Sequence, residues 1–264
     1  MLPCLRSCPP LLGASYTALE RMCWACSGGF TRRQFCQGLL AAPLAIGPYH
    51  KDGLVEPELR LRPQSGPRRV AVTLDACPGH FDPRIADVLV ARRIPATIFI
   101  TKTWMRMNPV GLTFFLKNPD IFTLENHGAL HLPPVLGAQR IYGLRVAGSW
   151  PAIEDEIAQG AAAIRQVTGR LPVWYRGAAG LYTPSVVPRI EALGVRVAGY
   201  SLNSDAGASF PADLVAARIR AAQDGDVIEG HINQPHRSSG AGIAAGLVAL
   251  QEAGVCFVRL DEAA

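Results

Sequence analysis

The chain has 264 residues, 49% of them hydrophobic and 18% charged, with a formal net charge of +5. This composition is too apolar for a disordered protein and is ample for one domain with a large core. Its arginines form no basic run with interleaved aromatic residues, which argues against a nucleic-acid partner. No run of about 18 apolar residues occurs, which argues against a permanent membrane span.

The first 46 residues differ from the rest of the chain. The pair Arg32 and Arg33 is followed by Phe35 and then by residues 38–46, a weakly apolar stretch of small side chains. This order resembles a twin-arginine export signal, whereas the simpler alternative is an amphipathic N-terminal helix. We therefore expect residues 1–46 to be a leader and the protein to be exported, to the periplasm or out of the cell.

Cysteine usage agrees with this division. Of the seven cysteines, five lie in the predicted leader: Cys4, Cys8, Cys23, Cys26 and Cys36. Cys77 follows one predicted strand and Cys256 begins another, so in a parallel sheet the two lie at opposite ends. We expect no disulfide between them.

After a connector with proline and glycine, residues 47–67, short apolar runs alternate with helical patterns. The runs are rich in β-branched and aromatic residues, as in buried parallel strands: residues 70–74, 96–100, 121–124, 173–175, 195–199, 227–229 and 255–260. Helices are predicted from Asp82-Pro83 to Arg93, from Ser149 to Gly169, from Thr183-Pro184 to Gly194, from Phe210-Pro211 onward, and over residues 240–254. About seven strands in βαβ units leave two choices, an open doubly wound sheet or a closed barrel.

Polar residues recur where these strands end. They are Asp75; Thr101 and Lys102; Asn126 and His127; Arg176; residues 201–205; and His231. In a parallel barrel such positions surround one mouth, where catalytic sites are assembled.

His127 and His131 are the most informative pair in this set. A spacing of four predicts two imidazoles on the same side of one helical turn, close enough to share a metal ion. A divalent ion on neutral imidazoles polarises a carbonyl and lowers the pKa of bound water to about 7. A nearby carboxylate could accept a proton from water, and a histidine across the site could protonate the leaving group.

The order of these elements resembles the polysaccharide deacetylases of carbohydrate esterase family 4, over roughly residues 68–262. Residues 72–75 match the family's first motif, Thr-Phe-Asp-Asp, and residues 126–131 match the second, His-x-x-x-His. The third, fourth and fifth motifs correspond to residues 174–177, 203–205 and 225–231.

The resemblance implies an α/β fold, a distorted seven-stranded parallel (β/α) barrel over residues 68–264. It implies a divalent metal, zinc with cobalt or nickel as alternatives, held by His127 and His131. The implied activity is hydrolysis of N- or O-linked acetyl groups from a polysaccharide or related glycan, a reaction on non-peptide carbon–nitrogen bonds in the first case.

The resemblance also implies roles for four further residues. Asp75 would be the catalytic base and Arg176 its ion-pair partner. His231 would be the general acid, oriented by Asp205. Read from the residues alone, Arg176 could instead serve only a buried salt bridge and Asp205 could simply cap a turn.

The chain departs from the family pattern at several positions. Ala76 stands where the family has a second aspartate, a metal ligand, and residues 177–179 replace the usual proline and aromatic. A third ligand is then needed, and we predict Asp82, with Asp75 as base. The rival assignment makes Asp75 the ligand and leaves the base unknown, and Asp82 before Pro83 also fits an ordinary helix N-cap.

Two other functions remain open. Ala76 is compatible with a non-catalytic relative that binds a glycan on the same barrel. A weaker alternative is a doubly wound sheet that binds a small ligand at its switch point.

Overall fold

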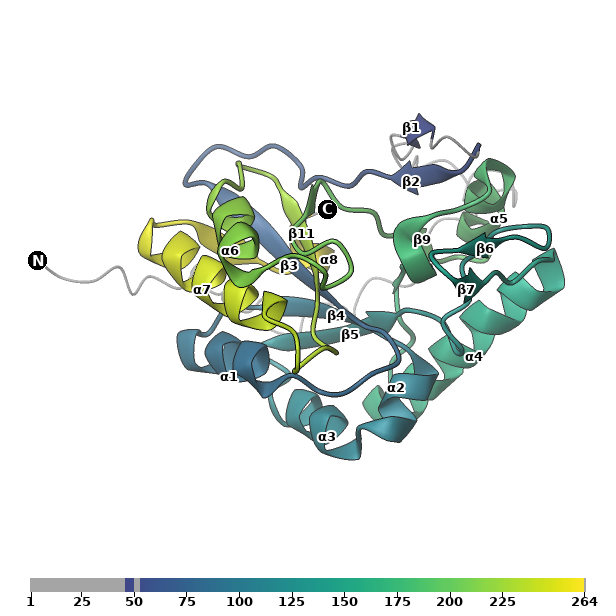
Figure 1. Ribbon diagram of the computed structural model, residues 1–264, viewed down its shortest axis with the longest axis horizontal. Helices are drawn as coiled ribbons and strands as arrows, with labels where there is room; N and C mark the ends of the chain where they lie inside the picture. Colours follow the sequence, from purple (N-terminus) through teal and green to yellow (C-terminus); the bar gives the residue numbers. More distant parts are fainter. Residues whose placement is uncertain (1–45, 50–52, 264) are drawn as a thin grey trace, which may run out of the picture. The chain divides into compact units, whose positions relative to one another are not determined.

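The computed structural model describes residues 46–49 and 53–263, and its centre is a curled parallel sheet (Figure 1). The strand order is β10 (Leu202–Asn203), β11 (Val227–His231), β3 (Arg69–Ala76), β4 (Ala96–Ile100), β5 (Phe122–Asn126), β8 (Trp174–Tyr175) and β9 (Arg196–Val197). A further strand, β12 (Cys256–Val258), pairs in parallel with the start of β3. Among the described residues no pairing joins β9 to β10, so the predicted seven-stranded barrel is confirmed as a half-barrel that stays open there.

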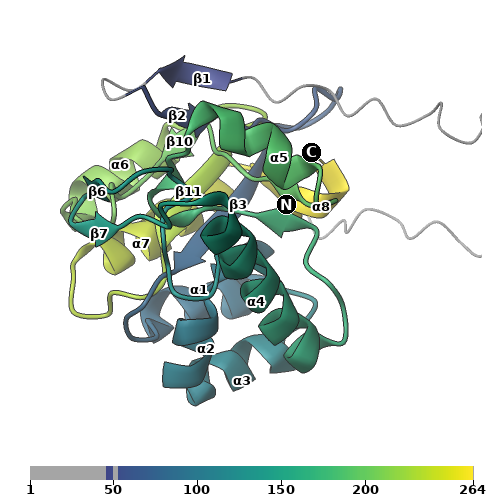
Figure 2. The same cartoon turned by 90° about the vertical axis from the view of Figure 1, so that its right-hand side faces the viewer.

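Helices cover the outside of this sheet (Figures 1 and 2). Those that the sequence pattern predicts are α1 (Pro83–Arg92), α4 (Trp150–Thr168), α5 (Val187–Glu191) with the preceding 3-10 turn (Pro184–Val186), α6 (Ala212–Arg220) and α7 (Ser239–Glu252). The pattern does not predict α2 (Lys102–Met107) and α3 (Pro109–Lys117), since the segment is divided at Pro109 into two short helices. A short α8 (Leu260–Ala263) follows β12, and no helix in the described ranges has the length and apolar character to cross a bilayer.

The central strand β3 is buried on both faces, which explains its continuous apolar run. Val72 and Leu74 pack in the cluster formed with α1 and α7, to which Leu89 and Leu247 belong. Because side chains alternate along a strand, Asp75 then points to the opposite, inner face of the half-barrel.

The connector is part of the folded domain. The strand β2 (Val55–Pro57) pairs with β1 (Ile46–Tyr49), and backbone hydrogen bonds of 2.9 Å join Val55 and Tyr182 in both directions. A Cβ atom on Gly199 would lie 1.9 Å from the Pro57 carbonyl oxygen, so only glycine allows this close approach. Residues 53–61 thus run beside the opening between β9 and β10. Residues 1–45 of the predicted leader lie outside the described residues, and its last residue, Ile46, begins β1.

Candidate active site

A cavity of about 950 Å³ opens at the carboxyl ends of the strands. It is lined by Asp75, Cys77, His127, His131, Glu229 and His231, and by the β6–β7 hairpin (β6, Arg140–Ile141; β7, Leu144–Arg145). The location is the one predicted from the strand ends.

Strand register places these side chains on one inner face. In the parallel pair β11–β3, His231 lies opposite Asp75 and Glu229 lies opposite Thr73. Cys77 comes two residues after Asp75, so it shares the inward direction of that aspartate.

Arg176 and Asp75 form a buried ion pair across the half-barrel. The Arg176 Nη1 atom lies 2.8 Å from Asp75 Oδ1, while Nη2 donates to Thr73 Oγ1 at 2.9 Å and to the Gly199 carbonyl at 3.0 Å. Burial raises the pKa of Asp75, but the charges of Arg176 and of the nearby histidines outweigh it and lower that pKa below its usual value. Asp75 is therefore a carboxylate at neutral pH.

His231 is held by the carboxylate of Asp205. The Asp205 Oδ1 atom lies 2.9 Å from His231 Nδ1, and Oδ2 accepts the His231 backbone N–H at 2.8 Å. Burial lowers the pKa of His231, but Asp205 and Glu229 outweigh it and raise that pKa well above 6.5. With Nδ1 bonded to Asp205, Nε2 is the nitrogen left to the cavity, and it carries a proton at neutral pH.

Glu229 is a buried acid of this cavity, and the motif comparison does not single it out. Its Oε1 atom lies 3.2 Å from His231 Nδ1, and Oε2 is buried with no hydrogen-bond partner. Burial raises its pKa to about 8, against the opposing effect of His231 and with help from Asp205 and Asp75. Its spacing of two before His231 in a strand is the signal that could have identified it.

The segment from His127 to His131 is a loop and not a helical turn, so this expectation from the spacing is wrong. Gly128 has φ +87° and His131 has φ +66°, values that end the extended backbone of β5 without forming a helix. Glu156 of α4 accepts the backbone N–H groups of Leu130 at 2.8 Å and Leu132 at 3.0 Å. The loop nevertheless brings the two imidazoles together, with ring centroids 5.0 Å apart.

The protonation of His127 follows from its partners. Its Nδ1 atom lies 2.7 Å from the Arg176 carbonyl oxygen, which can only accept, so Nδ1 carries the hydrogen and Nε2 faces the cavity. There Nε2 lies 3.4 Å from Cys77 Sγ and 3.7 Å from Asp75 Oδ2. Burial lowers the pKa of His127, but Asp75 and Cys77 outweigh it and raise that pKa to about 9. Burial raises the pKa of Cys77, but His131 and His127 bring it well below 9.0.

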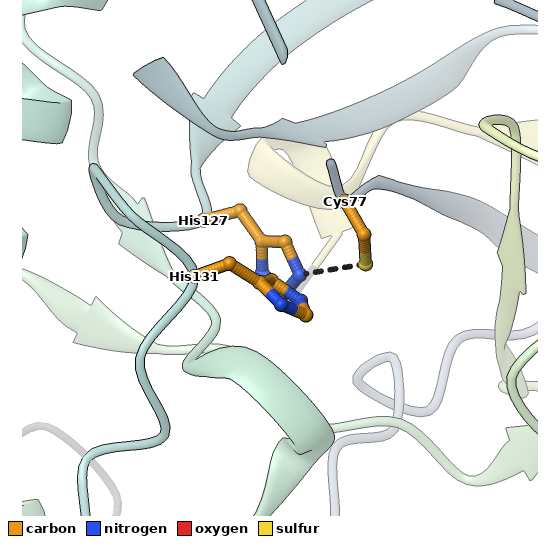
Figure 3. A group of neighbouring side chains, drawn as sticks. All are labelled: Cys77, His127 and His131. Carbon is orange, nitrogen blue, oxygen red and sulfur yellow. Dashed lines mark hydrogen bonds between the residues drawn. The ribbon is translucent and has the colours of Figure 1, made fainter. Parts of the chain in front are cut away.

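Cys77, His127 and His131 form a group that could hold a metal ion (Figure 3). Their ligand atoms all lie within 4.8 Å of one another, and His131 Nε2 is buried with no hydrogen-bond partner. A thiolate and two imidazoles are a donor set that zinc accepts, so the residues present fit a divalent ion of this kind. A second acidic group, Asp75 with Glu229 and His231, lies at the same cavity.

Asp82 does not belong to either group, and its assignment as third metal ligand needs correction. Its fully buried carboxylate caps α1 by accepting the Arg84 N–H at 3.1 Å and pairs with the Arg84 side chain at 2.6 Å. A helix start before proline favours such a cap, so the carboxylate is held away from the histidines. Cys77 is buried and Cys256 is exposed, and no disulfide joins these two cysteines.

Motif spacing gives neither Cys77 nor Glu56 a role at the site, although Cys77 directly follows the first motif. Cys77 lies two residues beyond the aspartate, and a cysteine at a strand exit beside a histidine pair is a recognisable ligand signal. Glu56 comes from the connector and accepts a hydrogen bond from Tyr200 at the edge of the cavity. No local sequence feature relates Glu56 to Tyr200, which lies 144 positions further along the chain.

Comparison with solved structures finds proteins of the same fold. PdaC, a peptidoglycan deacetylase from Bacillus subtilis, is similar with a TM-score of 0.60 at 19% identity, covering 76% of this chain and 91% of its own. PdaA from Bacillus subtilis, a family 4 carbohydrate esterase, gives 0.60 at 17% identity, covering 78% and 82%. A family 4 pseudoenzyme from Bacillus anthracis gives 0.59 at 18%, covering 75% and 66%, and a mutant of it with restored enzymatic activity is similar to the same degree.

Among proteins with curated descriptions, none matches this sequence significantly. The profile of the polysaccharide deacetylase family matches residues 62–198, just over half of the chain. That segment contains Asp75, His127, His131 and Arg176, and it ends before His231. The chain therefore belongs to the polysaccharide deacetylase family.

Proposed function

We propose that this protein is a metal-dependent deacetylase that hydrolyses N- or O-linked acetyl groups on a polysaccharide or related glycan. One observation carries the proposal: Asp75, paired with Arg176, and His231, paired with Asp205, face the same cavity beside the imidazoles of His127 and His131. Ala76, in place of the family's second aspartate, makes the chain a divergent member of the family.

The two sides of the cavity supply opposite halves of an acid–base pair. A water molecule adds to the acetyl carbonyl carbon while Asp75 takes a proton from that water. His231 gives its Nε2 proton to the sugar nitrogen or oxygen as the bond from that atom to the carbonyl carbon breaks. Acetate and a free amine or hydroxyl are the products.

Neighbouring groups keep this pair in its working protonation states. Arg176 fixes the position of Asp75 and favours its ionised form. Asp205 fixes the orientation of the His231 ring and favours its protonated form. A divalent ion held by His127 and His131, with zinc preferred and cobalt or nickel as substitutes, would polarise the carbonyl and activate the water.

The test is acetate release by the full-length protein from a panel of N-acetylated and O-acetylated oligosaccharides. Release should be lost on chelation and return when zinc or cobalt is restored. His127→Ala and His131→Ala should each lower both metal content and turnover. If neither substitution changed metal content or turnover, the proposal would fail.

A non-catalytic glycan-binding protein is the second candidate function. Two observations favour it: Ala76, and the similarity of the fold to a family 4 pseudoenzyme. It requires glycan binding, measured by calorimetry, that chelation does not change and that is not accompanied by acetate release. Metal-dependent acetate release by the wild type would exclude it.

We also propose that the protein is exported through a twin-arginine route. The support is the sequence of residues 31–46 alone, with Arg32 and Arg33 ahead of a weakly apolar segment. Replacing both arginines with lysine should retain the protein in the cytoplasm, as fractionation of the expressing cells would show. Unchanged export of that variant would contradict the route.

A further inference from the structure

We infer that Cys77 is the third protein ligand of the metal, so that the site is a cysteine–histidine–histidine zinc centre. The inference deepens the proposed function, since it concerns the metal on which that function depends. It assigns to a thiolate the place that the family's motif gives to a carboxylate at position 76.

The spacing of the ligand atoms suits zinc. Cys77 Sγ and His127 Nε2 are 3.4 Å apart. Two ligands of a tetrahedral zinc ion, with Zn–S and Zn–N bonds of about 2.3 and 2.05 Å, are separated by about 3.5 Å. His131 supplies the third atom of a group in which all ligand atoms lie within 4.8 Å of one another (Figure 3).

A hydrogen bond between Cys77 and His127 accounts for only part of this arrangement. It joins Cys77 Sγ to His127 Nε2 at 3.4 Å and does not include the second imidazole, that of His131. The Nε2 atom of His131 is buried and has no hydrogen-bond partner in the described part of the chain. Burying a ring nitrogen that has no partner costs free energy. A cation bound between the thiol and the two imidazoles would give this nitrogen a partner.

The surroundings orient the ligands as metal sites require. The Arg176 carbonyl accepts a hydrogen bond from His127 Nδ1, which leaves Nε2 as the ring nitrogen directed at the thiol. Histidines that bind metals usually have their other ring nitrogen fixed in this way.

Two of the carboxylates considered as the third ligand have ion-pair partners of their own. Asp82 is paired with Arg84, and Asp75 is paired through Oδ1 with Arg176. The second oxygen of Asp75, Oδ2, lies 3.7 Å from His127 Nε2, beside the three ligand atoms, where a base would accept a proton from water. Ala76 lies in the apolar cluster on the helix-covered face of β3, so its side chain points away from the histidines, whereas that of Cys77 lies beside them.

Thiolate ligation changes which metals the site prefers. A soft sulfur ligand with two imidazoles favours zinc over magnesium, calcium and manganese, which prefer oxygen donors. The site should therefore retain zinc through purification and should not be activated by magnesium.

The experiment compares the full-length wild type with Cys77→Ala, Cys77→Asp and the control Cys256→Ser. Cys256 is an exposed free thiol on β12, and the five leader cysteines are common to all four proteins. Zinc affinity is measured by competition with a chromogenic chelator after metal removal, and folding is checked by circular dichroism. Cobalt-loaded protein is examined for a thiolate-to-cobalt charge-transfer band, and cysteine alkylation with and without zinc is mapped by peptide mass spectrometry.

Loss of a ligand should cost more than the 10- to 100-fold that supporting residues contribute, so Cys77→Ala should weaken zinc binding by at least about 100-fold. Cys77→Asp should retain most of the affinity but lose the charge-transfer band. Zinc should protect Cys77 from alkylation and should leave Cys256 reactive. Cys256→Ser should match the wild type in every measurement.

Equal zinc affinity in Cys77→Ala and the wild type, with no protection of Cys77, would overturn the inference. If acetate release remained metal-dependent in that case, the proposed function would stand without it. Conversely, zinc ligation by Cys77 in a protein that releases no acetate would uphold this inference and refute the proposed function.

Discussion

Two carboxylates in the cavity, Asp75 and Glu229, show how burial and neighbouring charges together set different protonation states in one small space. Asp75 faces the Arg176 guanidinium at 2.8 Å and is ionised, whereas burial, with Asp205 and Asp75 nearby, raises the pKa of Glu229 to about 8. The first suits a base, and the second can donate a hydrogen bond to a substrate at neutral pH. The side-chain types alone do not distinguish these roles.

The role of Asp205 can be tested through the pH dependence of turnover. Asp205→Asn removes the charge that raises the pKa of His231, so the general acid should lose its proton at lower pH. We expect the alkaline limb of the kcat/KM profile to move to lower pH, with a loss of about 100-fold or more at the optimum. An unchanged alkaline limb would show that His231 is not the titrating acid.

Glu229 makes a stability prediction whose sign follows from its raised pKa. The folded protein holds the proton of Glu229 up to about pH 8, whereas the unfolded chain releases it near 4.5. This contribution to stability is therefore complete below pH 4.5 and is lost as pH rises through 8.

The isosteric Glu229→Gln variant carries no such titration. Its free energy of unfolding minus that of the wild type should increase between pH 4.5 and 8, by an amount on the order of a few kcal/mol. Urea unfolding of both proteins across this range measures the difference. A difference that stays constant with pH would contradict the raised pKa.

At the scale of elements, α4 organises the loop that carries the histidine pair. Glu156 accepts two backbone N–H groups on either side of His131, and Asn126 bonds both the Gly128 N–H and the Ile157 carbonyl. A Cβ atom on Gly128 would lie 2.6 Å from Glu156 Oε1, so the tight fit requires glycine at a φ of +87°. Contacts with α4 therefore fix the positions of His127 and His131, although these residues are not in a helical turn.

Removing the Glu156 carboxylate should loosen this loop. Glu156→Ala leaves the Leu130 and Leu132 N–H groups without an acceptor, at a cost of roughly 2–4 kcal/mol in unfolding free energy. Zinc affinity should fall as well, because His131 loses its fixed position. Thermal unfolding and zinc titration measure both effects, and Asp155→Ala, on the exposed side of the same helix, is the control.

At the scale of the whole molecule, the half-barrel depends on a segment that precedes its first strand. Leu54, Val55 and Leu61 are buried, and Leu61 packs with Trp174 and Val227 at the inner core. The same segment supplies Glu56 to the cavity. It therefore contributes to both the stability of the sheet and the boundary of the site.

A mutation in this segment tests whether the segment stabilises the fold through the packing of its side chains. Leu61→Ala should lower the unfolding free energy by about 2–4 kcal/mol, because it leaves a cavity among buried side chains. Leu171→Ala, at a position 58% exposed, should change it by less than about 0.5 kcal/mol. Equal denaturation midpoints for the two variants would mean that the connector adds nothing to the fold.

The sequence by itself determined the parallel strands, most of the helices and the polar residues at the strand ends. Those features depend on local patterns: buried runs of β-branched residues, capping residues such as Asp82, and the period of two that directs Asp75 inward. The motif order also predicted the site residues His127, His131, Arg176 and His231, which the structure brings to one end of the sheet.

Only the tertiary structure decided which groups meet at that end. Cys77 and His127 are 50 positions apart in the sequence. Cys77 lies beside the histidines because of the direction of its side chain at the end of β3, whereas Asp82 is held away from them by its ion pair with Arg84. The loop form of residues 127–131 depends on Glu156 in a helix that begins 19 residues later. Contacts between distant segments set these outcomes, because side-chain direction and burial at each position are fixed only once the sheet has curled.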